Sequence, residues 1–423
     1  MPKVLYDISI LGLGYYDNLY RSGIYRVIET LAVELLKIDD CDLSFCAYAG
    51  ITPMIKANKY FCDNSILKDG SWYVPRSEKA RITLNLLSKL YPKPGEEKGP
   101  RLWLLQLCRF LAKRSGVLHP MRDMELLRNA DIFHSTFWPL PEVVHTSLRM
   151  KRFMTIYDLI PILYPKYVNT GSDHILKVVR SISPNDFVLS ISQYTKQDLC
   201  EFTDIDPERV LVTPLAASSS FYCCKDSTIL KDARTKYGIP EAPYILSLSA
   251  PEPRKNISQT IRCFSRVVEE GGHPDINLVL VGAKGWDYSS TFDKLKISTT
   301  IRKRIIVPGY VADEDLAAVY SGALMFVYPS FYEGFGLPPL EAMQCGVPVI
   351  TSNTSSLPEV VGDAGIMVDP TDSDALCQAI SDLYADAGQR EDLKRKSLAR
   401  AQEFSWSKCA AQTFSAYQAA LSS

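Results

Sequence analysis

The feature of this sequence that most restricts its fold is a regular alternation of apolar strand-like runs and helical stretches. In the second half of the chain the runs lie at residues 244–249, 276–282, 304–309, 324–330, 347–352 and 365–369. Continuous apolar strands that alternate with helices are typical of a parallel sheet covered by helices on both faces. Ligands of such sheets bind at the carboxyl ends of the strands.

The first half of the chain shows the same alternation less regularly. Its strand-like runs lie at residues 3–11, 131–135, 153–159, 187–192 and 209–214. A length of 423 residues predicts two or three domains, at about 150 residues per domain. We therefore expect an α/β protein of two Rossmann-like doubly wound domains, residues 1–214 and 215–405, that face each other across a cleft.

The composition indicates a soluble globular protein. The apolar fraction is 46% and the formal net charge is −1, so we expect no nucleic-acid partner. Eleven cysteines without C-x-x-C spacing fit a reducing, cytoplasmic location better than a disulfide framework. The N-terminus reads as a first strand rather than a signal peptide, and no apolar run is long enough to predict a membrane span.

One stretch between two predicted strands combines helix breakers with carboxylates. It is "FYEGFGLPPLEAMQCGVPVI", residues 331–350. Gly334 and Gly336 let the loop backbone approach a ligand closely, and Pro338 and Pro339 fit the first turn of the next helix. A helix N-terminus with exposed amides suits a phosphate or another oxygen-rich ligand.

Two carboxylates flank this loop, and two cations follow an earlier strand. Glu333 lies in the loop, and Glu341 lies in the first helical turn, from which its side chain leans back toward the strand ends. Arg254 and Lys255 follow the strand at 244–249 and would meet a diphosphate in the same cleft. Because carboxylates suit sugar hydroxyls, the set indicates a nucleotide-sugar. Ordinary cap and turn residues are the alternative.

These motifs together resemble a known enzyme family. The segments "EPRKN", "PGYV" and "PSFYEGFGLPPLEAMQCGVPVITSNTSSLPEVVGDAGIMVDP" resemble the donor-binding domain of the retaining glycosyltransferases of family 4, which have the GT-B fold. The resemblance is strong over residues 240–406 and weaker over 1–214. The stretch "FSWSKCAAQTFSAY" also resembles that family, which implies that a C-terminal helix at 406–423 crosses back to the N-terminal domain.

The resemblance implies catalytic roles for Glu333, Lys255, Arg254 and Asp158. Glu333 would contact the donor sugar near the reacting carbon. Lys255 and Arg254 would neutralise the diphosphate leaving group. Asp158 would be the polar group that faces the donor or acceptor from the other domain.

The resemblance also implies a donor-binding set. Glu341 would take the ribose hydroxyls, and the remaining members are Gly334, Phe335, Gly336, Leu337, Gly309, Tyr310 and Gly23. The amides of residues 334–337 would hold the sugar or the phosphates. The loop at 308–311 would lie beside the base, and Gly23 would approach from across the cleft. The family also implies a nucleotide-sugar substrate, a glycan or lipid-linked glycan acceptor, no cofactor and no essential metal.

This sequence departs from the commoner family pattern in three places. Ala250 occupies the position of an Arg, for which Arg254 would substitute. Tyr157-Asp158 stands where the family has His-Asp. The linker "TPLAASSSF" replaces the usual "PNGVD". These departures keep open a non-catalytic homologue that binds a nucleotide-sugar or glycan. A nicotinamide-dependent oxidoreductase is disfavoured, because "LGLGYYDN" is not a dinucleotide-binding G-x-G-x-x-G motif.

A basic segment interrupts the first half of the chain. Residues 79–122 contain ten Lys/Arg and two Glu, and the predicted helix at 101–114 places Leu104, Leu107, Cys108 and Leu111 on one side. We favour an inserted helix that packs this side on the N-terminal domain and leaves a solvated basic face. The alternative is peripheral contact with the inner face of a membrane that carries a lipid-linked acceptor.

Three further polar residues allow a structural role beside a functional one. His134 ends a strand and would either line the cleft or be a satisfied buried histidine. Ser192 is predicted to cap a helix. Glu359 is predicted to serve a helix start.

Overall fold

A computed structural model of the chain describes residues 1–17, 23–72, 77–92, 100–115, 117–118, 129–147, 149–167, 172–249, 252–270, 275–282 and 288–423. Ala250 and parts of the 79–122 segment lie outside these residues.

The described residues of the first half form a parallel sheet of seven strands. The order is β3 (Ser71–Trp72), β2 (Asp42–Cys46), β1 (Lys3–Asp7), β4 (Ile132–Ser135), β5 (Lys151–Ile156), β6 (Phe187–Ser190) and β7 (Val210–Val212). The connecting helices include α1 (Ser9–Tyr16), α2 (Gly23–Leu36), α3 (Ile51–Asp63), α7 (Glu142–His145), α8 (Ile160–Leu163), α9 (Ser172–Arg180) and α10 (Gln193–Phe202). The strand order reverses direction between β1 and β4.

In the second half, the part of the chain that the structure describes forms a parallel sheet of six strands. The order is β10 (Ile305–Gly309), β9 (Asn277–Gly282), β8 (Tyr244–Ser249), β11 (Met325–Tyr328), β12 (Val349–Ser352) and β13 (Gly365–Val368). Its helices include α11 (Ser227–Tyr237), α12 (Ile257–Glu269), α13 (Ser289–Lys294), α14 (Thr299–Arg302), α15 (Asp313–Ser321), α16 (Leu337–Gln344), α17 (Leu357–Val361), α18 (Ser373–Ala385) and α19 (Ala387–Ala401).

The strands of the second sheet begin and end close to the predicted apolar runs. All residues of β11 and β12 are buried, and Phe326 pairs with Val349 in register between them. Burial on both faces explains why β11 is continuously apolar instead of alternating. The order reverses between β8 and β11, and a ligand cleft is expected at such a reversal.

The first predicted strand is shorter than expected. Residues 3–11 were expected to be extended, but β1 ends at Asp7 and α1 begins at Ser9. The Asp7 carboxylate accepts hydrogen bonds from the Ser9 amide at 3.1 Å and from the Ser9 hydroxyl at 2.5 Å, which turns the chain. Gly12 lies in α1, and a Cβ there would lie 2.3 Å from the Ala57 nitrogen. A glycine of "LGLG" therefore serves the packing of α1 on α3.

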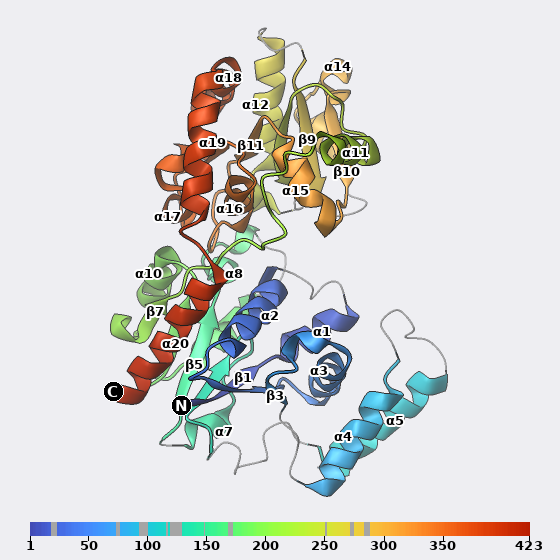
Figure 1. Ribbon diagram of the computed structural model, residues 1–423, viewed down its shortest axis with the longest axis vertical. Coiled ribbons are helices and arrows are strands. Elements are labelled where there is room, and N and C mark those ends of the chain that lie inside the picture. Colours follow the sequence, from blue (N-terminus) through green and yellow to red (C-terminus); the bar gives the residue numbers. More distant parts are fainter. Residues whose placement is uncertain are drawn as a thin grey trace.

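The C-terminal helix α20 (Trp406–Ser422) crosses back to the first domain, as predicted, and packs beside α2 (Figure 1). The Tyr417 hydroxyl lies 2.6 Å from Nδ1 of His134, and Nε2 of that ring lies 2.8 Å from the Thr155 hydroxyl. His134 is fully buried, and burial lowers the pKa of its imidazole to about 3. His134 is thus a satisfied buried histidine and does not line the cleft.

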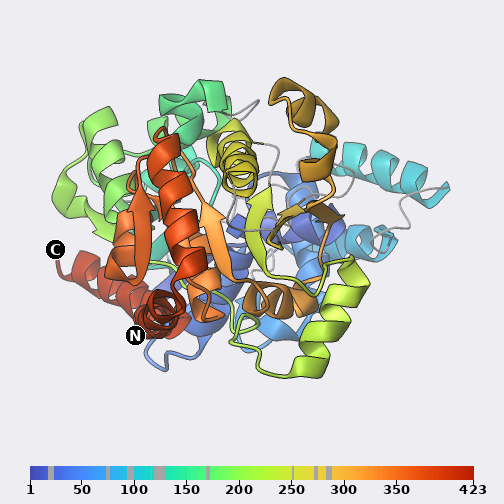
Figure 2. The same cartoon turned by 90° about the horizontal axis from the view of Figure 1, so that it is seen from above.

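The helices α4 (Glu78–Leu90) and α5 (Pro100–Ser115) form a hairpin that projects sideways from the first domain in both views (Figures 1 and 2). The predicted packing side of α5 is wrong. Leu105 and Ala112 are buried, whereas Leu104, Leu107 and Leu111 are exposed, and of the predicted side Cys108 alone is half-buried and packs on the core. The covered face is set by contact with α4, which the helical period alone does not reveal. Within the described ranges, no helix is long and apolar enough to cross a membrane.

Candidate active site

The predicted cations and carboxylate meet where the second sheet reverses its strand order. Arg254 and Lys255 lie in a short 3₁₀ turn, Pro253–Lys255, beyond the end of β8. Glu333 lies in the loop beyond the end of β11. Because β8 and β11 are neighbours in the sheet, their carboxyl ends bring these side chains together.

Both carboxylate oxygens of Glu333 are occupied. Its Oε1 lies 2.8 Å from Lys255 Nζ, and it accepts hydrogen bonds from the Tyr328 hydroxyl at 2.7 Å and the Ser330 hydroxyl at 2.9 Å. Its Oε2 lies 2.6 Å from Nη1 of Arg254. Glu333 thereby holds the two cations at the edge of the sheet. Sequence reasoning did not single out Tyr328 or Ser330, although both end a predicted strand.

The cluster is buried, and its electrostatics follow from this. Burial raises the pKa of the Glu333 carboxyl, but Lys255 and Arg254 outweigh that effect and hold it at about 2. Burial lowers the pKa of the Lys255 ammonium, and Glu333 opposes that shift. Burial also acts to lower the pKa of Arg254, but Glu333 and its other anionic neighbours raise it above the usual range. Glu333 is therefore ionised at neutral pH.

Gly334 brings this loop against the first domain. A Cβ at Gly334 would lie 2.3 Å from the carbonyl oxygen of Tyr157 and 2.9 Å from Cβ of Asp158. The carbonyl of Gly334 accepts hydrogen bonds from the Ser192 hydroxyl at 2.8 Å and the Thr195 hydroxyl at 3.1 Å. We expected the glycine to admit a ligand, but the close neighbour in the structure is the other domain.

Asp158 therefore lies beside the cation cluster, across the domain boundary. Its Oδ1 accepts a hydrogen bond from the Ile160 amide at 3.0 Å, at the start of α8. Burial raises the pKa of the Asp158 carboxyl, while Arg254 acts in the opposite direction. The four residues predicted as catalytic are thus brought together from two domains.

The loop before α16 leaves backbone donors unused. Among the described residues we find no acceptor for the N–H groups of Gly334, Phe335, Gly336 and Leu337. The following residues of α16, Pro338 and Pro339, have no N–H to offer. The donors available to an anion therefore lie in the loop and at the first helical residue. The Phe335 side chain packs away from the loop against Phe404, with ring centroids 5.9 Å apart.

A pocket of about 270 Å³ opens between the two domains beside this loop. Gly23 and Arg26 of α2 line it from the first domain, and Asp313, Leu337 and Glu341 line it from the second. Ala216 and Ser218 of the interdomain linker and Trp406 of α20 also contribute. Three of the predicted donor-binding residues, Gly23, Leu337 and Glu341, therefore share one cavity.

An ion pair bridges the two domains at the pocket. Nη2 of Arg26 lies 3.0 Å and 2.9 Å from the two carboxylate oxygens of Asp313. Sequence reasoning missed both residues, because nothing in the local pattern indicates that they meet. A Cβ at Gly23 would find no atom within 4 Å, so the glycine faces open space.

Glu341 occupies a less polar position than Glu333. Burial raises the pKa of its carboxyl to about 7, and a hydrogen bond from the Tyr320 hydroxyl, at 3.1 Å, opposes the shift. The group consequently changes charge near neutral pH. By contrast, Gly309 and Tyr310 lie outside the pocket lining, and the Tyr310 side chain is 61% exposed.

Ser192 and Glu359 have structural roles at one helix. The Ser192 hydroxyl accepts a hydrogen bond from the Thr195 amide at 3.0 Å, which makes it the predicted N-cap of α10. The carboxylate of Glu359 accepts hydrogen bonds from the backbone amides of Gln193 at 2.7 Å and Tyr194 at 2.6 Å. Glu359 thus serves a helix start, but the helix belongs to the other domain.

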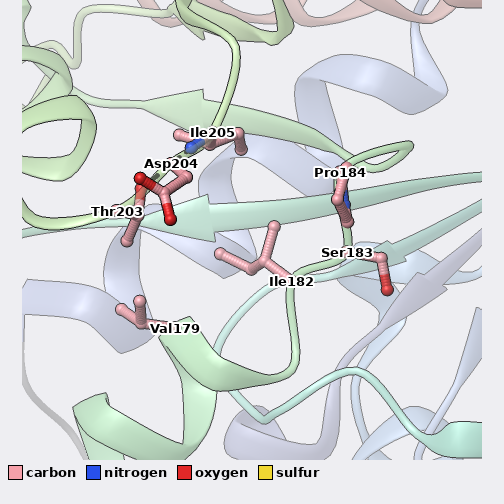
Figure 3. Close-up of a pocket in the computed structure, with 7 residues that line it drawn as sticks. All are labelled: Val179, Ile182, Ser183, Pro184, Thr203, Asp204 and Ile205. Atoms are coloured by element: carbon pink, nitrogen blue, oxygen red, sulfur yellow. Dashed lines mark hydrogen bonds between the residues drawn. The ribbon is translucent and has the colours of Figure 1, made fainter.

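A second cavity, of about 220 Å³, lies in the first domain (Figure 3). Its lining residues are Val179, Ile182, Ser183, Pro184, Thr203, Asp204 and Ile205. Asp204 is the one acidic or basic residue of this lining, so the cavity offers little chemistry. Within the described residues, no group of three or more His, Cys, Asp or Glu side chains could hold a metal ion.

Comparison with known proteins shows to which family this chain belongs. Residues 231–400 match the family described as glycosyl transferases group 1. The chain is 35% identical over 327 residues to the O-antigen chain mannosyltransferase B of Escherichia coli, which covers 76% of this chain and 83% of that relative. The chain belongs to the glycosyl transferases group 1 family.

A further relative and a solved structure are also similar to this chain. The MMP alpha-(1->4)-mannosyltransferase of Mycolicibacterium hassiacum is 26% identical over 381 residues, or 88% of each chain. The sucrose-phosphate synthase structure from Thermosynechococcus elongatus superimposes with a TM-score of 0.63 at 18% identity and covers 99% of this chain and 98% of its own. The predicted GT-B fold and the predicted glycosyltransferase activity are confirmed.

Proposed function

We propose that this glycosyltransferase moves a mannosyl residue, with retention of configuration, from a nucleoside-diphosphate-mannose to a hydroxyl of a glycan acceptor. The observation that carries the proposal is the buried cluster of Lys255, Arg254 and Glu333 beside a loop with unused amides. The choice of mannose rests on the relatives from Escherichia coli and Mycolicibacterium hassiacum, whose names both specify a mannosyltransferase.

The two cations would stabilise the leaving diphosphate as the bond to the sugar carbon breaks. Fixed charges in a site shielded from water act strongly on charge that develops in the transition state. Glu333 orients the cations and faces the positive sugar carbon. Because its pKa lies near 2, it carries no proton to donate at neutral pH. The departing phosphate would therefore take the acceptor proton on the face where the acceptor attacks.

The donor would extend from this cluster into the pocket at Glu341. Its carboxylate would accept hydrogen bonds from ribose hydroxyls, while Gly23 leaves space on the opposite wall. We assign donor binding to residues 215–405. Residues 1–214 together with 406–423 would bind the acceptor, with Asp158 facing it.

Donor choice is tested by a thermal-shift screen of the whole chain with GDP-, UDP- and dTDP-linked sugars. A ligand that binds only the native state raises the unfolding midpoint. We expect one mannose nucleotide to produce the largest rise, and a larger rise with a donor of another sugar would refute the mannosyl assignment.

Activity is tested by transfer to a glycan acceptor, with the anomeric configuration read by NMR. An inverted product would refute retention. Binding of a donor without transfer or slow hydrolysis would favour the non-catalytic homologue. Near wild-type transfer by both Glu333→Ala and Lys255→Ala would refute the assigned mechanism.

A further inference from the structure

Within the described part of the first domain, most of the large apolar side chains that are exposed lie on the α4–α5 hairpin. On α5, five of them are exposed by 48% to 79%: Trp103, Leu104, Leu107, Phe110 and Leu111. On α4, Ile82 and Leu86 are exposed by 58% and 52%. Single exposed apolar residues are ordinary on a protein surface, but a contiguous set indicates an interaction site.

The five side chains of α5 form one stripe. At 100° per residue they fall within an arc of about 120° on the helix. Leu105 and Ala112, which are buried against α4, lie on the opposite side. The helix therefore has two apolar faces, and the hairpin uses only one of them for its own packing.

The hairpin is also strongly basic. Three Lys/Arg lie in α4 and four in α5, which makes seven, whereas Glu78 is the one acidic residue of these two helices. Among the ion pairs found between described residues, none involves Lys79, Arg81, Lys89, Arg109, Lys113 or Arg114. Lys113 and Arg114 stand at the end of the apolar stripe, in the last turn of α5.

We propose that this hairpin docks the protein on an anionic lipid bilayer, with α5 lying in the plane of the interface. A helix with Trp, Phe and Leu on one face and flanking Lys/Arg fits that environment, because the apolar side chains enter the acyl boundary while the cations meet anionic headgroups. The tryptophan ring is suited to the boundary between the apolar and hydrated layers.

Charge distinguishes this occupant from a second copy of the chain. In a symmetric dimer the same patch meets itself, so Lys113 and Arg114 would be brought toward a surface that carries the same positive charge. An anionic bilayer offers the opposite charge and an apolar layer at the same place. The docking itself does not depend on which sugar is transferred, so its failure leaves the proposed activity untouched.

The test is flotation of the full chain with phosphatidylcholine vesicles that contain or lack phosphatidylglycerol. We expect binding to the anionic vesicles, weaker binding at high salt, and little binding to phosphatidylcholine alone. The double variant Trp103→Ser/Phe110→Ser should lower the vesicle partition coefficient by roughly a hundredfold, because two large side chains no longer enter the bilayer. Lys113→Glu/Arg114→Glu should lower it by roughly tenfold or more.

The control is Phe202→Ser/Ile229→Ser, which removes two large apolar side chains outside the hairpin that are 41% and 45% exposed. The control should bind like the wild type, and all variants should keep the wild-type unfolding midpoint because the altered residues are exposed. Equal partition of the wild type and the Trp103→Ser/Phe110→Ser variant would overturn the proposal. So would a concentration-dependent dimer in sedimentation velocity that the same variant abolishes.

Discussion

Gly334 is the position at which one added methyl group should separate the two domains. In Gly334→Ala the new Cβ would lie 2.3 Å from the Tyr157 carbonyl oxygen and 2.9 Å from Cβ of Asp158. Ordinary van der Waals contact requires a retreat of the loop by about 1 Å. Both obstacles are close to the backbone of the other domain, so no flexible side chain can move aside.

That retreat should break two hydrogen bonds. The Gly334 carbonyl lies 2.8 Å from the Ser192 hydroxyl and 3.1 Å from the Thr195 hydroxyl, and a shift of about 1 Å takes both beyond bonding distance. At about 0.5–1.5 kcal/mol for each bond, domain docking should weaken by about 1–3 kcal/mol. This corresponds to about 5- to 150-fold in the docking equilibrium.

The assay is kcat/KM for sugar transfer, together with the radius of gyration from small-angle X-ray scattering. We expect kcat/KM to fall by at most this factor, because it follows the docked fraction, and the radius to rise. The unfolding midpoint should change little, since Gly334 does not have positive φ and its backbone accepts alanine. Thr195→Val, which removes one of the two bonds without adding bulk, should show a smaller loss. Unchanged kcat/KM and radius in Gly334→Ala would refute the reasoning.

Three further predictions follow from the described contacts. Glu333→Gln leaves Lys255 and Arg254 without their buried carboxylate. The free energy of unfolding, measured with denaturant, should therefore fall by about 3 kcal/mol or more, and the rate of sugar transfer should fall about a hundredfold or more. Wild-type values for both would contradict the cluster's role. The pKa of Glu341 is raised from 4.5 to about 7 in the folded protein. Its contribution to stability should therefore be greatest below about pH 4.5 and decline as the pH rises through 7. Over the same range, donor affinity measured by calorimetry should rise, because the carboxylate forms. Glu341→Gln should flatten that pH dependence, and a dependence that persists would assign it to another group. Tyr417→Phe should lower the free energy of unfolding by about 1 kcal/mol and leave sugar transfer unchanged, because the lost hydroxyl bonds only the buried imidazole of His134. A change in KM would show that α20 also shapes the site.

Several contacts join the two domains, and those of Tyr332 and Gly334 lie in one loop. Besides Gly334, the ring of Tyr332 packs 4.9 Å from that of Tyr164, and its hydroxyl bonds Asp198. Glu359 reaches across to the start of α10. Since Glu333 lies between Tyr332 and Gly334, the loop that docks the domains also carries the carboxylate that holds the cations.

The sequence by itself determined the two parallel sheets and the composition of the cation cluster. Strand and helix periods depend on neighbouring residues, so six predicted runs of the second half became β8 to β13 with small changes at their ends. Arg254, Lys255 and Glu333 follow adjacent parallel strands, and this topology alone places them at one edge. The roles of these residues are predictions that rest on the resemblance to a family.

Only the tertiary structure decided which surfaces those elements use. Gly334 faces the other domain, and Arg26 pairs with Asp313, because two domains meet at residues far apart in the chain. On α5, Leu105 is covered while Leu107 stays exposed, since a helix with two apolar faces buries the one its neighbour reaches. Such choices depend on packing between distant segments, and no local pattern of residues encodes them.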